Sequence, residues 1–170
     1  MGGLSLTQVY GVGMYSDKLG AKLALGKFSK YKESPVSALP ASFYQAVSGG
    51  FGKTLVLKMS YGVSKEKMAG ALASSIKPRM GAGGGKVLAA FEQALLDGCE
   101  AHAKGGRACA GTEFTFKLKG SSLGVAVNGK QVKTLSSAPL CKALLNCYFD
   151  AKTVSPALKS TCAEGLLALC

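Results

Sequence analysis

SLGVAVNGKQVKTLSSAPLCKALLNCYF, residues 122–149, joins a hairpin pattern directly to a helical one. Asn128-Gly129 separates two runs of β-forming residues and is typical of a two-residue hairpin turn. The apolar run that follows predicts a helix over residues 138–149. A hairpin that runs straight into helices indicates strands and helices in separate blocks, as in layered α+β domains.

The rest of the chain extends this pattern in both directions. Further strands are predicted over residues 4–15, 54–60 and 112–120. Further helices are predicted over residues 18–27 (capped by Asp17), 41–48, 65–76 (capped by Ser64), 86–102, and 156–169, which begins at Ser155-Pro156. We find no internal repeat and expect one α+β domain over residues 1–170, with an antiparallel sheet covered by a layer of helices.

Bulk composition favours a folded globule without a membrane span. The chain has 170 residues, of which 48% are hydrophobic and 18% charged, enough to bury a core. No run approaches the roughly 18 apolar residues that a spanning helix needs. No leader of the secretory type is recognised at the start.

Net charge is +12, from 21 Lys and Arg against nine Asp and Glu. A strongly positive net charge suggests nucleic acid or an anionic surface as a candidate class of partner. The cations are spread thinly, among them Lys27, Lys30, Lys32, Lys53, Lys58, Lys65 and Lys67. Only Arg79 and Arg107 are arginines, whereas readers of nucleic acid favour Arg forks. We interpret the lysines as a solvated basic surface and expect no nucleic-acid partner.

The six cysteines form no CxxC pair, and the single histidine, His102, cannot complete a common zinc set with them. They lie among apolar helical positions, where cysteine packs as a small hydrophobe. A disulfide framework is the alternative and would require an exported chain; a reducing compartment is favoured. We expect no metal and no cofactor.

Two glycine-rich stretches imitate nucleotide-binding loops. GVGMYS (residues 11–16) has Ser16 where the dinucleotide motif has its third glycine, and the next strand arrives only near Thr54. GAGGGKV (residues 81–87) has Met80 where a P-loop needs glycine, and no hydroxyl follows Lys86. Both stretches therefore predict ordinary strand and loop.

The first predicted strand offers a different kind of site. Two-residue alternation places one set of side chains on a common face: Leu4, Leu6, Tyr10, Val12 and Met14. Gly11 and Gly13 fall on the opposite face, where glycine often allows close approach by a ligand or backbone. A buried Tyr10 hydroxyl would need a partner. Acidic residues are dispersed, so no paired-carboxylate mechanism is indicated, and the residues favour a binder over a hydrolase.

Four stretches of the sequence, taken in the same order along the chain, resemble the chalcone isomerase superfamily. They are VYGVGMYSDKLGAKLALGKF, FYQAVSGGFGKTLVLKMSYGVSKEKMAGAL, GTEFTFKLKGSSLGVAVNG and SSAPLCKALLNCYFDAKTVSPALK, and together they cover nearly the whole chain. The resemblance implies a chalcone-isomerase-like open-faced β-sandwich, with a ligand cleft between the sheet and its helices. The superfamily includes true isomerases, non-catalytic helpers of flavonoid synthesis and plastid fatty-acid-binding proteins.

Carried over by position, the catalytic threonine of the enzymes falls on Tyr10, and their tyrosine and asparagine fall near Lys67 and Ser74. The late threonine or serine falls on Cys147, followed by Tyr148. Since none of these positions keeps the enzyme's residue, the resemblance implies the non-catalytic, fatty-acid-binding branch. There the strand position is a tyrosine that joins an arginine in holding the carboxylate.

That arginine would lie about a dozen residues before Tyr10, ahead of Met1, so we expect the family's first strand segment to be missing from this chain. Another cation, such as Lys67, would have to serve. We therefore expect a monomer that binds a fatty acid or similar apolar anion, oriented by Tyr10, with a plastid location implied by the branch. The expected cleft lining is Val9, Gly11, Val12, Ala71, Cys147 and Tyr148, with Lys67 and Ser74 beside it. Three alternatives stay open: the protein keeps residual isomerase activity, it is a non-catalytic helper of flavonoid synthesis, or it is an interaction protein that has lost the pocket.

Overall fold

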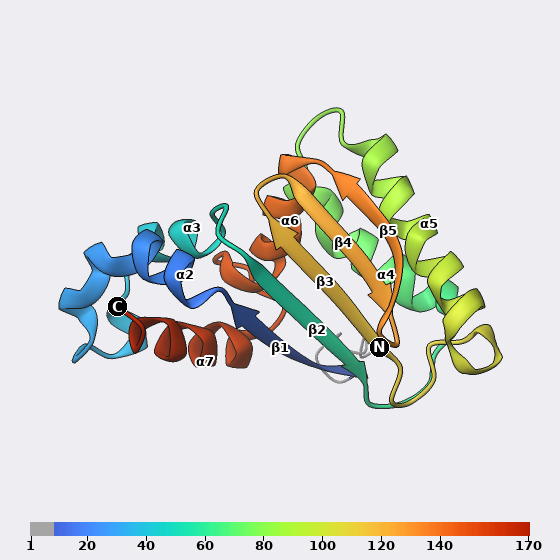
Figure 1. Cartoon of the computed structure of the whole chain (residues 1–170), viewed down its shortest axis with the longest axis horizontal. Coiled ribbons are helices and arrows are strands. Elements are labelled where there is room, and N and C mark those ends of the chain that lie inside the picture. Colours follow the sequence, from blue (N-terminus) through green and yellow to red (C-terminus); the bar gives the residue numbers. More distant parts are fainter. Residues whose placement is uncertain (1–8) are drawn as a thin grey trace.

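A single antiparallel sheet organises the molecule (Figure 1). The computed structural model describes residues 9–170. Its strands follow one another in the order β1-β2-β3-β4-β5: β1 (Tyr10–Ser16), β2 (Lys53–Met59), β3 (Glu113–Lys119), β4 (Ser122–Val127) and β5 (Lys130–Ser136). Each strand pairs antiparallel with the next. The part of the predicted first strand before Val9, with Leu4 and Leu6, lies outside the described residues.

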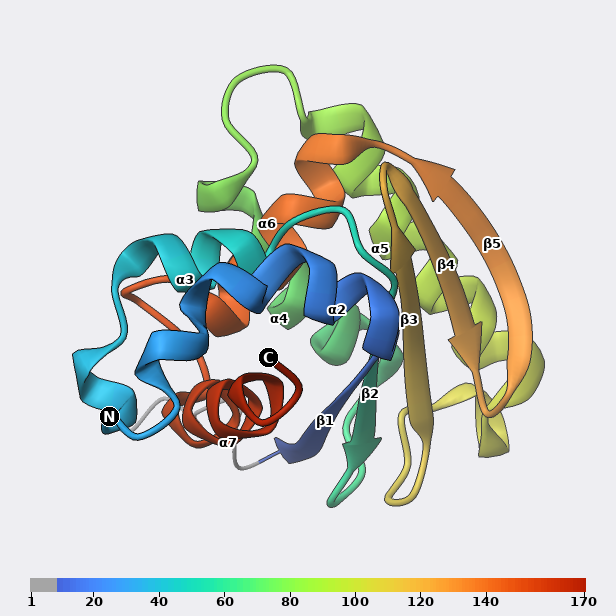
Figure 2. The same ribbon diagram turned by 60° about the vertical axis from the view of Figure 1, so that its left-hand side comes forward.

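Helices cover one face of this sheet and continue past its β1 edge (Figure 2). They are α2 (Lys18–Leu25), α3 (Ala41–Val47), α4 (Lys65–Ile76), α5 (Gly85–His102), α6 (Ala138–Phe149) and α7 (Pro156–Leu167). Helix α5 packs on β4 and β5, and α4 packs between α5 and α6. Helices α2, α3 and α7 gather at the β1 end. The predicted α+β architecture, with helices on one face of an antiparallel sheet, is confirmed.

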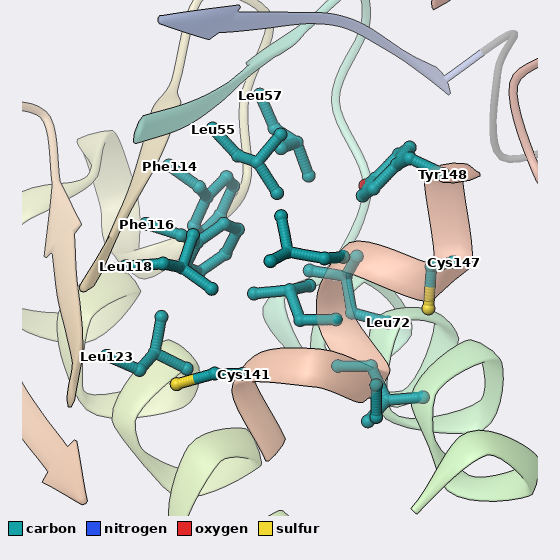
Figure 3. Packing of buried hydrophobic residues seen from close by; sticks show 14 of the residues in the cluster. Leu55, Leu57, Leu72, Phe114, Phe116, Leu118, Leu123, Cys141, Cys147 and Tyr148 are labelled. Atoms are coloured by element: carbon teal, nitrogen blue, oxygen red, sulfur yellow. The ribbon is translucent and has the colours of Figure 1, made fainter. Parts of the chain in front are cut away.

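Strand alternation builds the core. The inward residues are fully buried or nearly so: Leu55, Leu57 and Met59 on β2, Phe114, Phe116 and Leu118 on β3, and Leu123, Val125 and Val127 on β4. Figure 3 shows those of them that it labels facing Leu72 of α4 and Cys141 of α6 across a filled interior. The space beneath the middle of the helical layer is therefore occupied by the protein's own side chains.

The hairpin forms where the sequence predicts it. Asn128 and Gly129 both have positive φ, 49° and 78°, as a two-residue turn between twisted strands requires. The Asn128 side chain also fixes its neighbours, since its Oδ1 accepts from the Glu113 amide at 2.9 Å and its Nδ2 donates to the His102 carbonyl at 2.9 Å. The turn thus connects the sheet to the end of α5.

Strand β1 lies at the edge of the sheet and alternates as predicted. Tyr10 is buried, while Val12 and Met14 are half-buried and pack against the core. Gly11 and Tyr15 are exposed on the other face. A Cβ added at Gly11 or Gly13 would meet no atom within 4 Å, so no backbone approaches these glycines.

The interpretation of the lysines as surface residues is wrong for Lys53, which is 3% exposed. Lys53 begins β2 on the same face as Leu55 and Leu57. Its Nζ donates to the carbonyl oxygens of Gly49 at 2.6 Å and Phe51 at 2.9 Å, which satisfies the buried ammonium without a carboxylate. Burial lowers the pKa of Lys53 to about 8.

The cysteines behave partly as predicted. All six are free, and Cys99, Cys141 and Cys147 are buried as small hydrophobes, while the other three are half-buried. Among residues 9–170, no helix is long and apolar enough to cross a membrane.

Candidate functional site

A groove runs along the outer edge of the sheet, between β1 and α7, with a volume of about 750 Å³. That volume is within the range of ligand pockets, roughly 300–1,000 Å³. Because β1 rises about 3.3 Å per residue, its seven residues give the groove a length on the order of 20 Å. The lining residues are Tyr10 to Ser16, Lys18, and on the helix side Ser155, Ala157, Leu158, Thr161, Cys162, Gly165, Leu166 and Leu169.

On the helical wall of the groove, small exposed residues form the rim and buried apolar residues form the floor. Ala157, Thr161 and Gly165 recur every four residues, so they form one stripe along α7, and all three are exposed. Leu158, Cys162 and Leu166 follow one position further on at the same spacing, and the two leucines are buried while Cys162 is half-buried. Small residues on the rim leave room above an apolar floor, which suits a narrow apolar ligand.

A pair of buried tyrosines lies at one end of the groove. The Tyr10 and Tyr148 hydroxyl oxygens are 3.0 Å apart, and the two residues are 2% and 1% exposed. Burial raises the pKa of Tyr10 to about 12 and that of Tyr148 well above its usual value, so both stay protonated at neutral pH. Within residues 9–170 the two hydroxyls share one hydrogen bond and have no other partner, so one of their two protons has no acceptor in that part of the chain.

The first turn of α7 lies at the same end. The Val154 amide donates to the Cys147 carbonyl at 2.8 Å, and the Thr153 hydroxyl donates to the Tyr148 carbonyl at 2.6 Å. These bonds hold the start of α7 beside the end of α6. Ser155 caps α7 by accepting from the Leu158 amide, and it also lines the groove. The positive end of the α7 dipole therefore lies beside the end of α6 that carries Tyr148.

The other end of the groove carries a cation. Lys18, the first residue of α2, is the one basic side chain among the lining residues, and it is exposed. Lys18 follows the last residue of β1 by two positions, so it lies at the opposite end of the groove from Tyr10. The site therefore has a buried hydroxyl end, an apolar middle and an exposed ammonium end.

Comparison with solved structures finds a match over almost the whole described fold. The crystal structure of the Arabidopsis thaliana fatty-acid binding protein AtFAP1 superposes with a TM-score of 0.77 at 20% sequence identity, covering 95% of this chain and 79% of that one. This chain has the chalcone-isomerase-like fold. No protein-family model and no curated protein sequence matches it.

Within the chalcone-isomerase-like fold, the structure brings together part of the predicted site. Tyr10, Gly11 and Val12 line the groove, and Tyr148 reaches Tyr10 through its hydroxyl. Val9 is buried directly before β1, outside the groove lining.

Three predicted positions on α4 lie elsewhere. Lys67 and Ser74 are exposed and Ala71 is half-buried, and none of them lines the groove. Ser64 caps α4 by accepting from the backbone amide of Lys67 at 3.1 Å, and this bond does not involve the Lys67 side chain. The cation nearest the groove is therefore Lys18, which the sequence-based reasoning did not select.

Cys147 is buried on α6 and lies outside the groove lining. Figure 3 shows its sulfur directed away from the Tyr148 ring. Burial raises the pKa of the Cys147 thiol to about 12, which keeps it neutral and unreactive. Cys147 therefore packs on α6 outside the groove, with Arg79 as a neighbour of its thiol.

The α7 wall was missed altogether by the sequence-based reasoning, although the helix itself was predicted. The missed feature is the recurrence of Ala157, Thr161 and Gly165 every four residues beside an apolar row. Such a stripe could have been found, but only the fold places it opposite β1. Two further hollows, on the uncovered sheet face near Lys117 and between α3 and α6 near Asn146, include none of the predicted site residues.

Proposed function

We propose that this protein binds a fatty acid or a similar apolar anion, without catalysis, in the groove between β1 and α7. The observation that carries the proposal is the combination of an apolar groove with a buried tyrosine pair that has one unshared hydroxyl proton. The fold it shares with a protein described as fatty-acid binding supports the same assignment.

The carboxylate of the ligand would lie at the Tyr10 end. An anion in an apolar site needs hydrogen bonds to offset lost hydration. Tyr10, which lines the groove, can donate its proton to the carboxylate while it accepts from Tyr148, and the first turn of α7 adds the positive end of a helix dipole. The hydrocarbon chain would then extend along Val12 and Met14 towards Lys18.

The absence of catalysis rests on the groups present at the matched positions. Isomerase-type cyclisation needs a polarised ketone and a stabilised phenolate. The raised pKa values of Tyr10 and Cys147 keep both groups neutral, and Lys67 lies outside the groove. If purified protein consumes a chalcone faster than the spontaneous rate, the enzymatic alternative replaces this assignment.

A binding titration with palmitate, followed by calorimetry, tests the proposal. The Tyr10→Phe variant removes one hydroxyl and keeps the ring. We expect wild-type protein to bind palmitate and the variant to bind it about tenfold more weakly, the loss of one hydrogen bond to a charged group. If wild-type protein does not bind palmitate or related fatty acids, the proposal is wrong.

We also propose a monomer located in a plastid, on the strength of the family resemblance alone. Light scattering of the purified protein and imaging of a fluorescent fusion of the full-length protein test these two points separately.

A further inference from the structure

Large exposed hydrophobic side chains are concentrated in one short segment of the described chain. Tyr15, Leu19 and Leu23 are 69%, 67% and 79% exposed, and they fall within nine consecutive residues. Tyr15 lies near the end of β1, shortly before α2 begins, and the two leucines belong to α2 itself. We call these three residues the α2 patch. Single exposed apolar residues are ordinary, but a cluster of them marks a surface that contacts something.

Helix geometry places the two leucines where water contact is greatest. Ala21 and Leu25 are the buried residues of α2 and pack inward against the core. At 3.6 residues per turn, Leu19 and Leu23 fall on the opposite side of the helix. Helix α2 is therefore apolar on the side that faces away from the protein, which is unfavourable in water unless another apolar phase covers it.

Lysines lie along one flank of the α2 patch. Lys18 and Lys22 lie one turn apart on the flank of the same helix, and both are exposed. Lys27, Lys30 and Lys32 follow at once, and no acidic residue occurs between Asp17 and Glu33. Leucines at the outer pole with ammonium groups on the flank fit a surface that is apolar inside and negatively charged outside.

The α2 patch adjoins the groove at Tyr15. Tyr15 and Lys18 line the groove at its ammonium end, and α2 packs against α7, the groove's other wall. Figure 1 shows α2 beside α3 and α7 at the β1 end of the molecule, whereas α5 lies at the opposite end, against β4 and β5. A surface that covers the α2 patch would therefore face the open end of the groove.

We propose that the α2 patch docks this protein on a lipid bilayer that contains anionic lipids, with Leu19 and Leu23 inserted at the headgroup boundary. Lys18 and Lys22 then reach the lipid phosphates while their alkyl stems stay in the interface. The apolar area is small, so docking is reversible and depends on negative lipid charge. Docking does not depend on the proposed ligand, although it would bring the groove to a source of fatty acid.

Co-sedimentation with vesicles tests this directly. Vesicles of phosphatidylcholine alone are compared with vesicles of phosphatidylcholine and phosphatidylglycerol. We expect binding to the anionic vesicles only. The double variant Leu19→Ser/Leu23→Ser should weaken it roughly tenfold or more through lost apolar burial. Lys22→Glu should weaken it at least about fivefold.

Tyr61→Ser is the matched control, because Tyr61 is also exposed but lies in the loop after β2, away from α2. It should bind vesicles as the wild type does. The proposal is overturned if no vesicles are bound, or if binding survives the double leucine change. It is also overturned if the leucine variant instead abolishes a concentration-dependent dimer in the absence of lipid.

Palmitate binding without vesicles separates the two proposals. None of Leu19, Leu23 and Lys22 lines the groove. The leucine variant should therefore keep the wild-type affinity for palmitate while losing the vesicles. A failure of palmitate binding in every protein would reject the proposed function and leave docking to be judged by the vesicles alone.

Discussion

The Tyr10 hydroxyl on β1 and the Tyr148 hydroxyl on α6 lie 3.0 Å apart, although 138 residues separate them in the sequence. The pair joins the edge of the sheet to the helical layer at the end of the groove. Because only one of two protons is shared, the pair is both a structural tie and a donor. This double use makes Tyr10 the residue whose substitution is most informative.

Alkaline pH should reveal the burial of this pair. The pKa of Tyr10 is about 12 in the folded protein against 10.0 as the usual value, so between these values the folded protein keeps a proton that the unfolded chain has lost. This stabilisation is complete below pH 10 and is lost as the pH rises through about 12. In the wild type, this titration lowers the unfolding free energy by about 1.4 kcal/mol for each pH unit between the two pKa values. Tyr10→Phe should lack this contribution to the fall.

Denaturant unfolding at a series of pH values measures this effect. Tyr15→Phe, a change at an exposed tyrosine on the same strand, is the matched control. An unchanged pH dependence in Tyr10→Phe would mean that the Tyr10 hydroxyl is not buried as the structure has it.

Arg79 should be required as an arginine. Its Nε and Nη2 donate to the two Asp150 carboxylate oxygens at 2.7 and 3.2 Å, and Nη1 donates to the Ser75 carbonyl at 2.6 Å. A lysine cannot reproduce this planar set of donors. Arg79→Lys should lower the unfolding free energy by about 2 kcal/mol, whereas Arg107→Lys, at an exposed position, should leave it within about 0.5 kcal/mol of wild type. Equal stability of the two variants would contradict this role.

Two helical glycines should respond in opposite ways to alanine. A Cβ at Gly98 on α5 would lie 2.6 Å from Val127 Cγ2 and 2.9 Å from Val132 Cγ2, so Gly98→Ala should destabilise by about 1–3 kcal/mol. A Cβ at Gly165 on α7 meets nothing within 4 Å, so Gly165→Ala should stabilise by about 0.5–1 kcal/mol. Thermal unfolding of both variants checks the signs, and a Gly98→Ala protein as stable as wild type would mean that α5 does not pack so closely on β4 and β5.

The direction of the ligand can be read from the two ends of the groove. If the carboxylate lies at the tyrosine end, Tyr10→Phe weakens palmitate binding about tenfold. Lys18→Gln should then change it by less than about threefold, since an exposed ion pair contributes little. Calorimetric titration of both variants makes the comparison. The reverse order of effects would place the carboxylate at Lys18.

The helices and the hairpin could be predicted from sequence because their determinants are local. Ser64, Ser137 and Ser155 each cap the helix that follows them, and Asn128-Gly129 can form few turns other than the one observed.

The groove depended on contacts between distant segments, which no local pattern carries. Tyr10 was found because alternation makes a buried hydroxyl conspicuous. Lys67 was favoured on resemblance, but the fold leaves it exposed on α4 and puts Lys18 at the groove instead. Burial of Lys53 was missed for a similar reason: the carbonyl groups that satisfy it belong to a turn whose path is set by the fold.

The most direct test fills the groove without touching either polar end. Thr161 is exposed on the rim of the groove, and Ser160 is exposed beside it but does not line the groove. Palmitate is titrated into wild-type protein, Thr161→Phe and Ser160→Phe after each is shown to unfold at the same temperature. We expect wild type and Ser160→Phe to bind palmitate with equal affinity and Thr161→Phe to bind it more than about tenfold more weakly. Equal binding by all three proteins would contradict a ligand site between β1 and α7.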